Sequence, residues 1–140
     1  MSDRYFVDTN ILIYAHDATA GKKHLRARTL VDRLWDESTG VLSTQVLQEL
    51  CINLRRKLSK PLPVAEVRAI LRNYSRWQVV VNTSESVLEA LEIESRHKTS
   101  FWDALILQAA GKAGVTLLYS EDLSHGQVYG SVQVVNPFLD

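Results

Sequence analysis

Short apolar segments typical of strands alternate along this chain with longer segments of helical periodicity. The expected strands are residues 5–7, 40–43, 78–81, 115–119 and 132–135. The expected helices are residues 11–15, 23–38, 44–54, 65–74, 84–97 and 101–112. Strands that alternate with helices predict a parallel sheet covered on both faces. The expected fold class is therefore α/β, a three-layer α/β/α sandwich around a central, mostly parallel sheet.

No feature of the sequence divides the chain into parts. It has no internal repeat and no linker rich in Gly, Ser or Pro, and Pro61 and Pro63 mark only a short loop between two helices. A length of 140 residues suits one domain, and a hydrophobic content of 46% suffices for one core. We expect residues 1–140 to form a single domain.

The sequence also limits where the protein works. No apolar run approaches the ~18–20 residues that span a membrane, and the N-terminus shows no basic stretch followed by an apolar segment. The single cysteine, Cys51, excludes an internal disulfide framework and a zinc-finger pattern, and its apolar neighbours predict a buried thiol. We therefore expect a cytoplasmic protein without a membrane segment.

Charge is unevenly distributed although the formal net charge is zero. Residues 1–76 contain 13 basic and 8 acidic residues, a net charge of +5, whereas residues 77–140 contain 3 and 8, a net charge of −5. Such an asymmetry can mark a surface that faces a polyanion. It can equally arise by chance between solvated helix faces, and both interpretations stay open.

Four acidic residues lie near the carboxyl ends of the expected strands or on helices beside them. They are Asp8, Glu49, Asp103 and Asp122. Asp8 and Asp122 follow strands, Asp103 lies in the first turn of a helix, and Glu49 lies about one and a half turns into another. Since open sheets of this kind bind ligands at the carboxyl ends of their strands, we expect the four side chains to converge there.

Two of these acids have apolar neighbours, which is unusual for a carboxylate. Glu49 is flanked by Leu47 and Leu50, and Asp103 lies between Trp102 and Ala104. Converging carboxylates repel one another unless a cation lies between them, and oxygen ligands of this kind suit Mg²⁺ or Mn²⁺. Taken singly, each acid has a simpler explanation: a helix start, a turn, a helix-dipole partner, or a side chain that reaches solvent.

All four acids lie in motifs that resemble those of the PIN-domain ribonucleases, and particularly the VapC-like toxins of bacterial toxin–antitoxin pairs. The matching segments are residues 5–14 (YFVDTNILIY), 43–50 (STQVLQEL), 101–106 (FWDALI) and 118–123 (LYSEDL). The resemblance covers essentially the whole chain. It implies a PIN-like sandwich, an endoribonuclease that depends on Mg²⁺ or Mn²⁺, a homodimer, an RNA substrate, and a cognate antitoxin protein that blocks the site.

The sequence departs from the family pattern after the fourth motif. Many members carry a further acidic residue two places on, where this chain has Ser124. Glu121 is adjacent to Asp122 but would point elsewhere in an extended segment, so the coordination of a second metal ion stays open. By the same resemblance, Ser120 matches a hydroxyl that supports the site.

As a mechanistic hypothesis, Asp8, Asp103 and Asp122 bind the metal ion, and Glu49 binds a second ion or orients the attacking water. Thr9 and Asn10 either assist the site or cap the first helix. His125 is expected on a surface loop.

Several larger or basic side chains have two open interpretations. Basic residues that follow Glu49 either grip RNA phosphates or occupy a helix C-terminus; they are Arg55, Arg56, Lys57 and Lys60. Trp102 is expected to pack in the core, because it lies about 100° around the helix from Asp103. Trp35 and Trp77 are expected in the core or in a dimer interface.

Two alternative functions stay open at this stage. A receiver-like phosphoacceptor domain also clusters carboxylates, but it would need paired acids after the first strand and a late lysine, and Asn10 offers no second acid. A phosphatase with an Asp-x-Asp pair fails at the same position. A PIN fold that has lost catalysis and only binds RNA or protein is the second alternative. The chain has no Gly-rich phosphate-binding loop.

Overall fold

The computed structural model describes residues 3–139 and contains one sheet of six strands. The strands are β1 (Tyr5–Val7), β2 (Gly40–Ser43), β3 (Gln78–Val80), β4 (Leu117–Tyr119), β5 (Val128–Tyr129) and β6 (Val132–Val135). Their order across the sheet is β3-β2-β1-β4-β6-β5. All neighbouring pairs are parallel except β5 and β6, which form an antiparallel hairpin.

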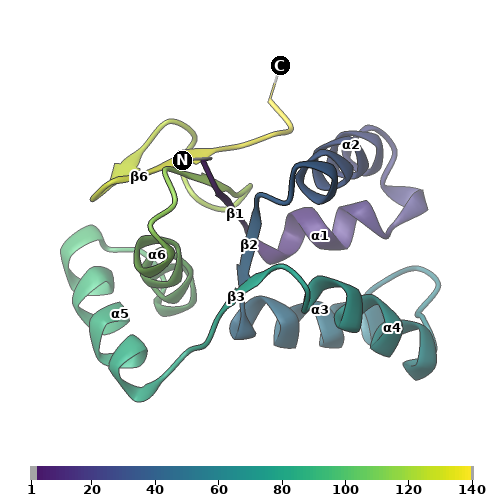
Figure 1. Ribbon diagram of the computed structural model, residues 1–140, viewed down its shortest axis with the longest axis horizontal. Coiled ribbons are helices and arrows are strands. Elements are labelled where there is room, and N and C mark those ends of the chain that lie inside the picture. Colours follow the sequence, from purple (N-terminus) through teal and green to yellow (C-terminus); the bar gives the residue numbers. More distant parts are fainter. Residues whose placement is uncertain (1–2, 140) are drawn as a thin grey trace.

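Helices cover both faces of this sheet. They are α1 (Thr9–Ala15), α2 (Lys22–Glu37), α3 (Thr44–Arg56), α4 (Val64–Tyr74), α5 (Ser84–His97) and α6 (Phe101–Ala113), with one turn of 3₁₀ helix at Ala18–Ala20. Figure 1 shows α5 and α6 on one side of the strands and α1 to α4 on the other. The predicted three-layer α/β/α sandwich with a mostly parallel sheet is confirmed.

Polar caps set where the helices begin and end. The side chains of Asp8, Ser43 and Ser100 each accept a backbone N–H in the first turn of the helix that follows. Thr83 and Ser86 form a reciprocal capping box at the start of α5. Gly114 ends α6 with a φ of 73°, a left-handed conformation that glycine adopts without strain.

Strand β5 and the 3₁₀ turn are absent from the sequence-based prediction. Strand β5 has two residues, too few for an alternating pattern, and it exists because Val128 and Tyr129 pair with β6 across a tight turn at Gly130. Strands β3 and β4 are also shorter than predicted, since β3 ends at Val80 and β4 begins at Leu117. The observed β3 and β4 thus differ from the predicted strands in length and not in type.

The core confirms some predicted burials and corrects others. Trp77 is buried, and Trp35 packs against it with ring centroids 5.4 Å apart, so both belong to the core. Cys51 is only half-buried, since α4 covers that side of α3 incompletely. The core prediction for Trp102 is wrong, because its side chain is 62% exposed. Its helix α6 buries the residues that follow and turns this position towards solvent.

Within residues 3–139, no helix is both long enough and apolar enough to cross a membrane.

Candidate functional site

The pairing of β1 with β4 brings the first and fourth acidic motifs together. The two strands are parallel, with Val7 opposite Tyr119, and the Asp8 N–H donates to the Tyr119 carbonyl over 2.9 Å. Both strands end at this point, so Asp8 and the loop that contains Asp122 leave the same edge of the sheet. Asp8 and Asp122, which are 114 positions apart in the chain (122 − 8), thus become neighbours.

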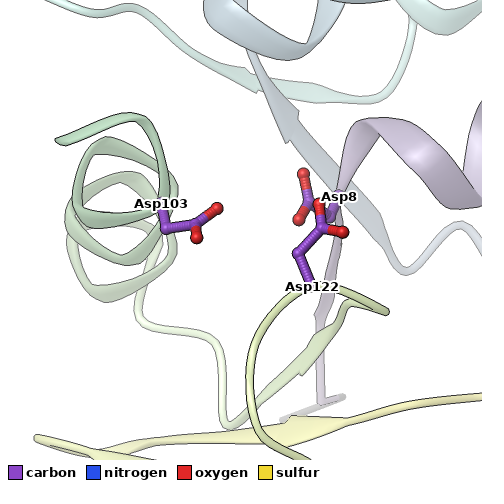
Figure 2. A group of neighbouring side chains, drawn as sticks. All are labelled: Asp8, Asp103 and Asp122. Atoms are coloured by element: carbon purple, nitrogen blue, oxygen red, sulfur yellow. The ribbon is translucent and has the colours of Figure 1, made fainter. Parts of the chain in front are cut away.

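Asp103 reaches the same place from the opposite layer. It lies in the first turn of α6, whose N-cap Ser100 accepts the Asp103 backbone N–H over 3.1 Å. Carboxylate oxygens of Asp8, Asp103 and Asp122, one from each residue, lie within 4.8 Å of one another. Figure 2 shows the three side chains pointing towards a common centre from α6, the end of β1 and the loop after β4. Among the described residues, this is the group that could bind a metal ion.

Asp8 is the buried member of this cluster, with an exposed fraction of 5%. Its Oδ2 accepts from the Ser120 hydroxyl over 2.9 Å, and its Oδ1 accepts from the Thr9 N–H over 2.7 Å. Burial raises the pKa of Asp8 to about 7, the two hydrogen bonds oppose the rise, and the charges of Asp122 and Glu49 add to it. An ionised Asp8 therefore needs a positive charge close by.

Asp122 is exposed and is oriented by a neighbour from α1. The Asn10 side-chain N–H donates to Asp122 Oδ2 over 2.9 Å, and the Asp122 backbone N–H donates to the Ser120 hydroxyl over 3.2 Å. Partial burial raises the pKa of Asp122, with further contributions from the charges of Asp103 and Glu121. The Asn10 bond and the Ser120 bond together fix the loop that presents this carboxylate.

Glu49 lies beside the cluster rather than in it. Its Oε1 accepts from the Thr9 hydroxyl over 2.7 Å, which directs the carboxylate towards the start of α1. The four acids line one cavity of about 80 Å³ together with Thr9, Asn10, Gln45, Asn53, Trp102 and Ile106. The structure therefore brings all four predicted residues to one cavity, but only the three aspartates within reach of a common ion.

Glu121 points away from the cavity, although residues 121–123 form bends rather than the extended segment in which alternation with Asp122 would have placed it there. It accepts from the Tyr14 hydroxyl over 2.9 Å and pairs with Lys23. Ser124 and His125 are exposed, and His125 accepts the Asn136 backbone N–H over 3.0 Å. None of these three side chains replaces the further acidic residue of the family pattern.

Gln45 and Asn53 line the cavity but were absent from the sequence-based candidates. They lie four residues before and four residues after Glu49, so all three share one face of α3. The Asn53 side chain donates to the Glu49 carbonyl over 2.7 Å. The spacing around Glu49 was the signal that could have identified both amides.

The basic residues that follow Glu49 lie outside the acidic cavity. Arg55 and Arg56 occupy the last turn of α3 and Lys57 is its C-cap. Of the residues that the structure describes, no lysine or arginine lines the acidic cavity. Their position matches the helix C-terminus interpretation, and no observation tests a contact with RNA.

The donor set of the cavity fits a hard divalent cation. It consists of carboxylate oxygens, which Mg²⁺ and Mn²⁺ prefer, and their mutual distances allow them to share one ion. Burial raises the pKa of Asp8, so a cation placed among the three carboxylates would favour its ionised form. Hydrogen bonds from Ser120, Thr9 and Asn10 orient the carboxylates from behind, as outer-shell partners do in metal sites.

Fold and site together define an α/β protein with a cluster of carboxylates at the carboxyl edge of its sheet that could bind a cation. The sequence model of the PIN domain matches residues 5–130. The chain therefore belongs to the PIN-domain family, and the resemblance seen in its four motifs is confirmed. A comparison with curated protein sequences gives no match.

Solved structures with the same fold are toxins and toxin–antitoxin complexes. Mycobacterium tuberculosis VapC20, a Sarcin-Ricin loop cleaving toxin, is 27% identical, with 84% of this chain and 89% of that chain covered and a TM-score of 0.66. A toxin–antitoxin complex from Klebsiella pneumoniae is 16% identical, covers 96% and 98%, and has a TM-score of 0.69. DNA-bound VapBC from Salmonella typhimurium is 18% identical, covers 95% and 97%, and has a TM-score of 0.63.

Proposed function

We propose that residues 1–140 act as one endoribonuclease domain that depends on Mg²⁺ or Mn²⁺ and serves as the toxin of a toxin–antitoxin pair. The convergence of Asp8, Asp103 and Asp122 on one centre is the observation that supports this proposal. Membership of the PIN-domain family and the likeness to VapC20 agree with it. Metal binding by a PIN domain explains the cluster of carboxylates without the alternative of a receiver-like phosphoacceptor domain.

The four acidic residues divide into two roles in the proposal. Asp8, Asp103 and Asp122 would bind the divalent cation, which supplies positive charge to the phosphoryl oxygens and acidifies water. Glu49 stands outside this group, and its Thr9 bond fixes one oxygen and leaves the other to orient or deprotonate the attacking water. In-line attack on phosphorus would break the bond to the 3′ oxygen and leave 3′-hydroxyl and 5′-phosphate ends.

The direct test incubates the purified protein with bacterial total RNA in Mg²⁺, in Mn²⁺ and in EDTA, and maps the new ends by sequencing. We expect discrete cleavage with either cation and none in EDTA. Cleavage that persists in EDTA would refute the metal dependence. The absence of cleavage under all three conditions would favour the alternative of a PIN fold that only binds RNA or protein.

Ser120→Ala is expected to lower the catalytic efficiency of RNA cleavage about 10- to 100-fold. The buried Ser120 hydroxyl donates to Asp8 and accepts the backbone N–H groups of Asp122 and Leu123, so its loss disturbs two ligands at once. Steady-state kinetics measure the effect. Ser124→Ala is the matched control in the same loop, because Ser124 is exposed and makes no described side-chain contact. Equal losses in both variants would mean that the loop, rather than the Ser120 hydroxyl, is responsible.

Two protein partners complete the proposal. An antitoxin is supported by the fold shared with toxin–antitoxin complexes, and a homodimer by exposed apolar side chains of Val87, Leu88 and Leu91 on one side of α5. The antitoxin is tested by expressing this chain alone and together with a neighbouring small gene. We expect the chain alone to arrest growth, and the second protein to co-purify with it and to relieve the arrest. Light scattering of the purified chain tests the homodimer.

A further inference from the structure

An exposed tryptophan lies at the acidic cavity and has no part in the reaction described above. Trp102 is 62% exposed and lines the cavity that contains the carboxylates. The other two tryptophans, Trp35 and Trp77, pack against each other in the core. A large aromatic ring left in solvent forgoes apolar burial, and its place beside the cavity leaves it available to a ligand.

The structure holds this position of the chain firmly. The Gln45 side-chain N–H donates to the Trp102 carbonyl over 3.2 Å, and Gln45 itself is only 5% exposed. The Phe101 ring, which packs against the small core between α5 and α6, meets the Trp102 ring edge-on with centroids 5.4 Å apart. The Gln45 bond fixes the backbone here and the Phe101 ring restricts the Trp102 ring on one side, which reduces the conformational freedom that the ring loses when it binds a flat partner.

The charges around the cavity limit how it can retain RNA. Its described lining includes four carboxylates and no lysine or arginine. Even with one divalent cation bound, four carboxylates leave this centre with a net negative charge, which repels the phosphates that flank the bond to be cleaved. An uncharged contact is therefore needed close to the centre, and stacking suits it, because every nucleobase offers a π-face to an aromatic side chain.

We propose that Trp102 stacks on an unpaired base next to the cleaved phosphate. The contact requires an unpaired nucleotide beside the cleaved phosphate, since a base inside a duplex has no free face for the ring. This inference rests on the proposed ribonuclease function. It assigns to Trp102 a contact with substrate rather than with the core.

Steady-state kinetics on bacterial total RNA test the contact. Trp102→Ala should raise KM about ten-fold or more while kcat changes less than about three-fold, because the ring binds the base and not the reacting atoms. Trp102→Phe should retain most of the affinity. Leu25→Ala removes a comparably exposed apolar side chain on α2 and should leave both constants unchanged. An unchanged KM in Trp102→Ala, with cleavage intact in the native chain, overturns the inference and leaves the proposed function standing.

Fluorescence separates this inference from the proposed function. In EDTA, poly(A) should quench the emission of the native protein but not that of Trp102→Phe, and inorganic polyphosphate should quench neither. Equal quenching by polyphosphate, or none by poly(A), counts against stacking whether or not RNA is cleaved. If Trp102→Ala instead turns a dimer into a monomer by light scattering and KM stays unchanged, the ring contacts a second copy of the chain and the inference is wrong.

Discussion

Asp8→Asn is expected to reduce RNA cleavage about a thousand-fold or more while the chain remains folded. Asp8 is buried at the centre of the cluster, where it accepts hydrogen bonds from Ser120 and Thr9. Asparagine keeps nearly the same shape and one of the acceptors but removes the charge that a divalent cation requires. Asp103→Asn should have a similar effect, because its carboxylate completes the cluster from the opposite layer.

Cleavage rates and circular dichroism, measured on the same preparations, check this expectation. Asp36→Asn is the matched control, because Asp36 is an exposed acid on α2 that does not line the acidic cavity. It should retain full activity. Full activity in both Asp8→Asn and Asp103→Asn would end the assignment of this cavity as the active site.

Mg²⁺ or Mn²⁺ is expected to raise the Tm of the protein by about 5–10 °C at a hundred-fold excess over Kd. A ligand that binds only the folded state contributes about 2.7 kcal/mol at that excess, and about 1 kcal/mol shifts the Tm of a chain of this size by roughly 2–4 °C. The three aspartates repel one another without the cation and coordinate it together when it is present. Differential scanning calorimetry with and without EDTA measures the shift.

Variants of three of the acids, measured by calorimetry and by RNA cleavage, separate metal binding from catalysis. Asp8→Asn and Asp103→Asn should lose the cation-dependent shift and, in EDTA, should be no less stable than the native chain, since each removes one repelling charge. Glu49→Gln should keep most of the shift and still lose activity, because Glu49 lies outside the three-residue group. A shift that survives in Asp8→Asn, or disappears in Glu49→Gln, would contradict this division of roles.

Much of the fold could be predicted from periodicity alone. Each predicted helix and strand exists. Short continuous apolar runs mark strands that are buried on both faces of a covered sheet, and amphipathic segments mark the helices that cover it. The hairpin at Val128 and Tyr129 could not be predicted, since two residues contain no pattern and pair only because β6 is already in place. The helix start at Ser43 and the helix end at Gly114 could also be predicted. A serine hydroxyl accepts a backbone N–H at a helix start, and glycine adopts the left-handed conformation that ends a helix, so both depend on local chemistry alone.

The convergence of the four acids on one cavity could also be predicted, but not their relative places. Asp122 joins Asp8 and Asp103 within 4.8 Å, whereas the Glu49 carboxylate accepts a hydrogen bond from Thr9 and lies beside this group. That difference depends on the Asn10 and Ser120 hydrogen bonds, which join segments more than a hundred residues apart. No local pattern encodes such contacts.

The sequence by itself therefore determined the α/β class and the gathering of carboxylates at one edge of the sheet. Both follow from chain-local rules: the side-chain period of each element and the common direction of parallel strands. Only the tertiary structure decided which three acids can share a cation, that Glu121 turns to Tyr14 and Lys23, and that Trp102 faces solvent beside the cavity. These outcomes depend on strand register and on the rotation of each helix against its neighbours, which long-range packing sets.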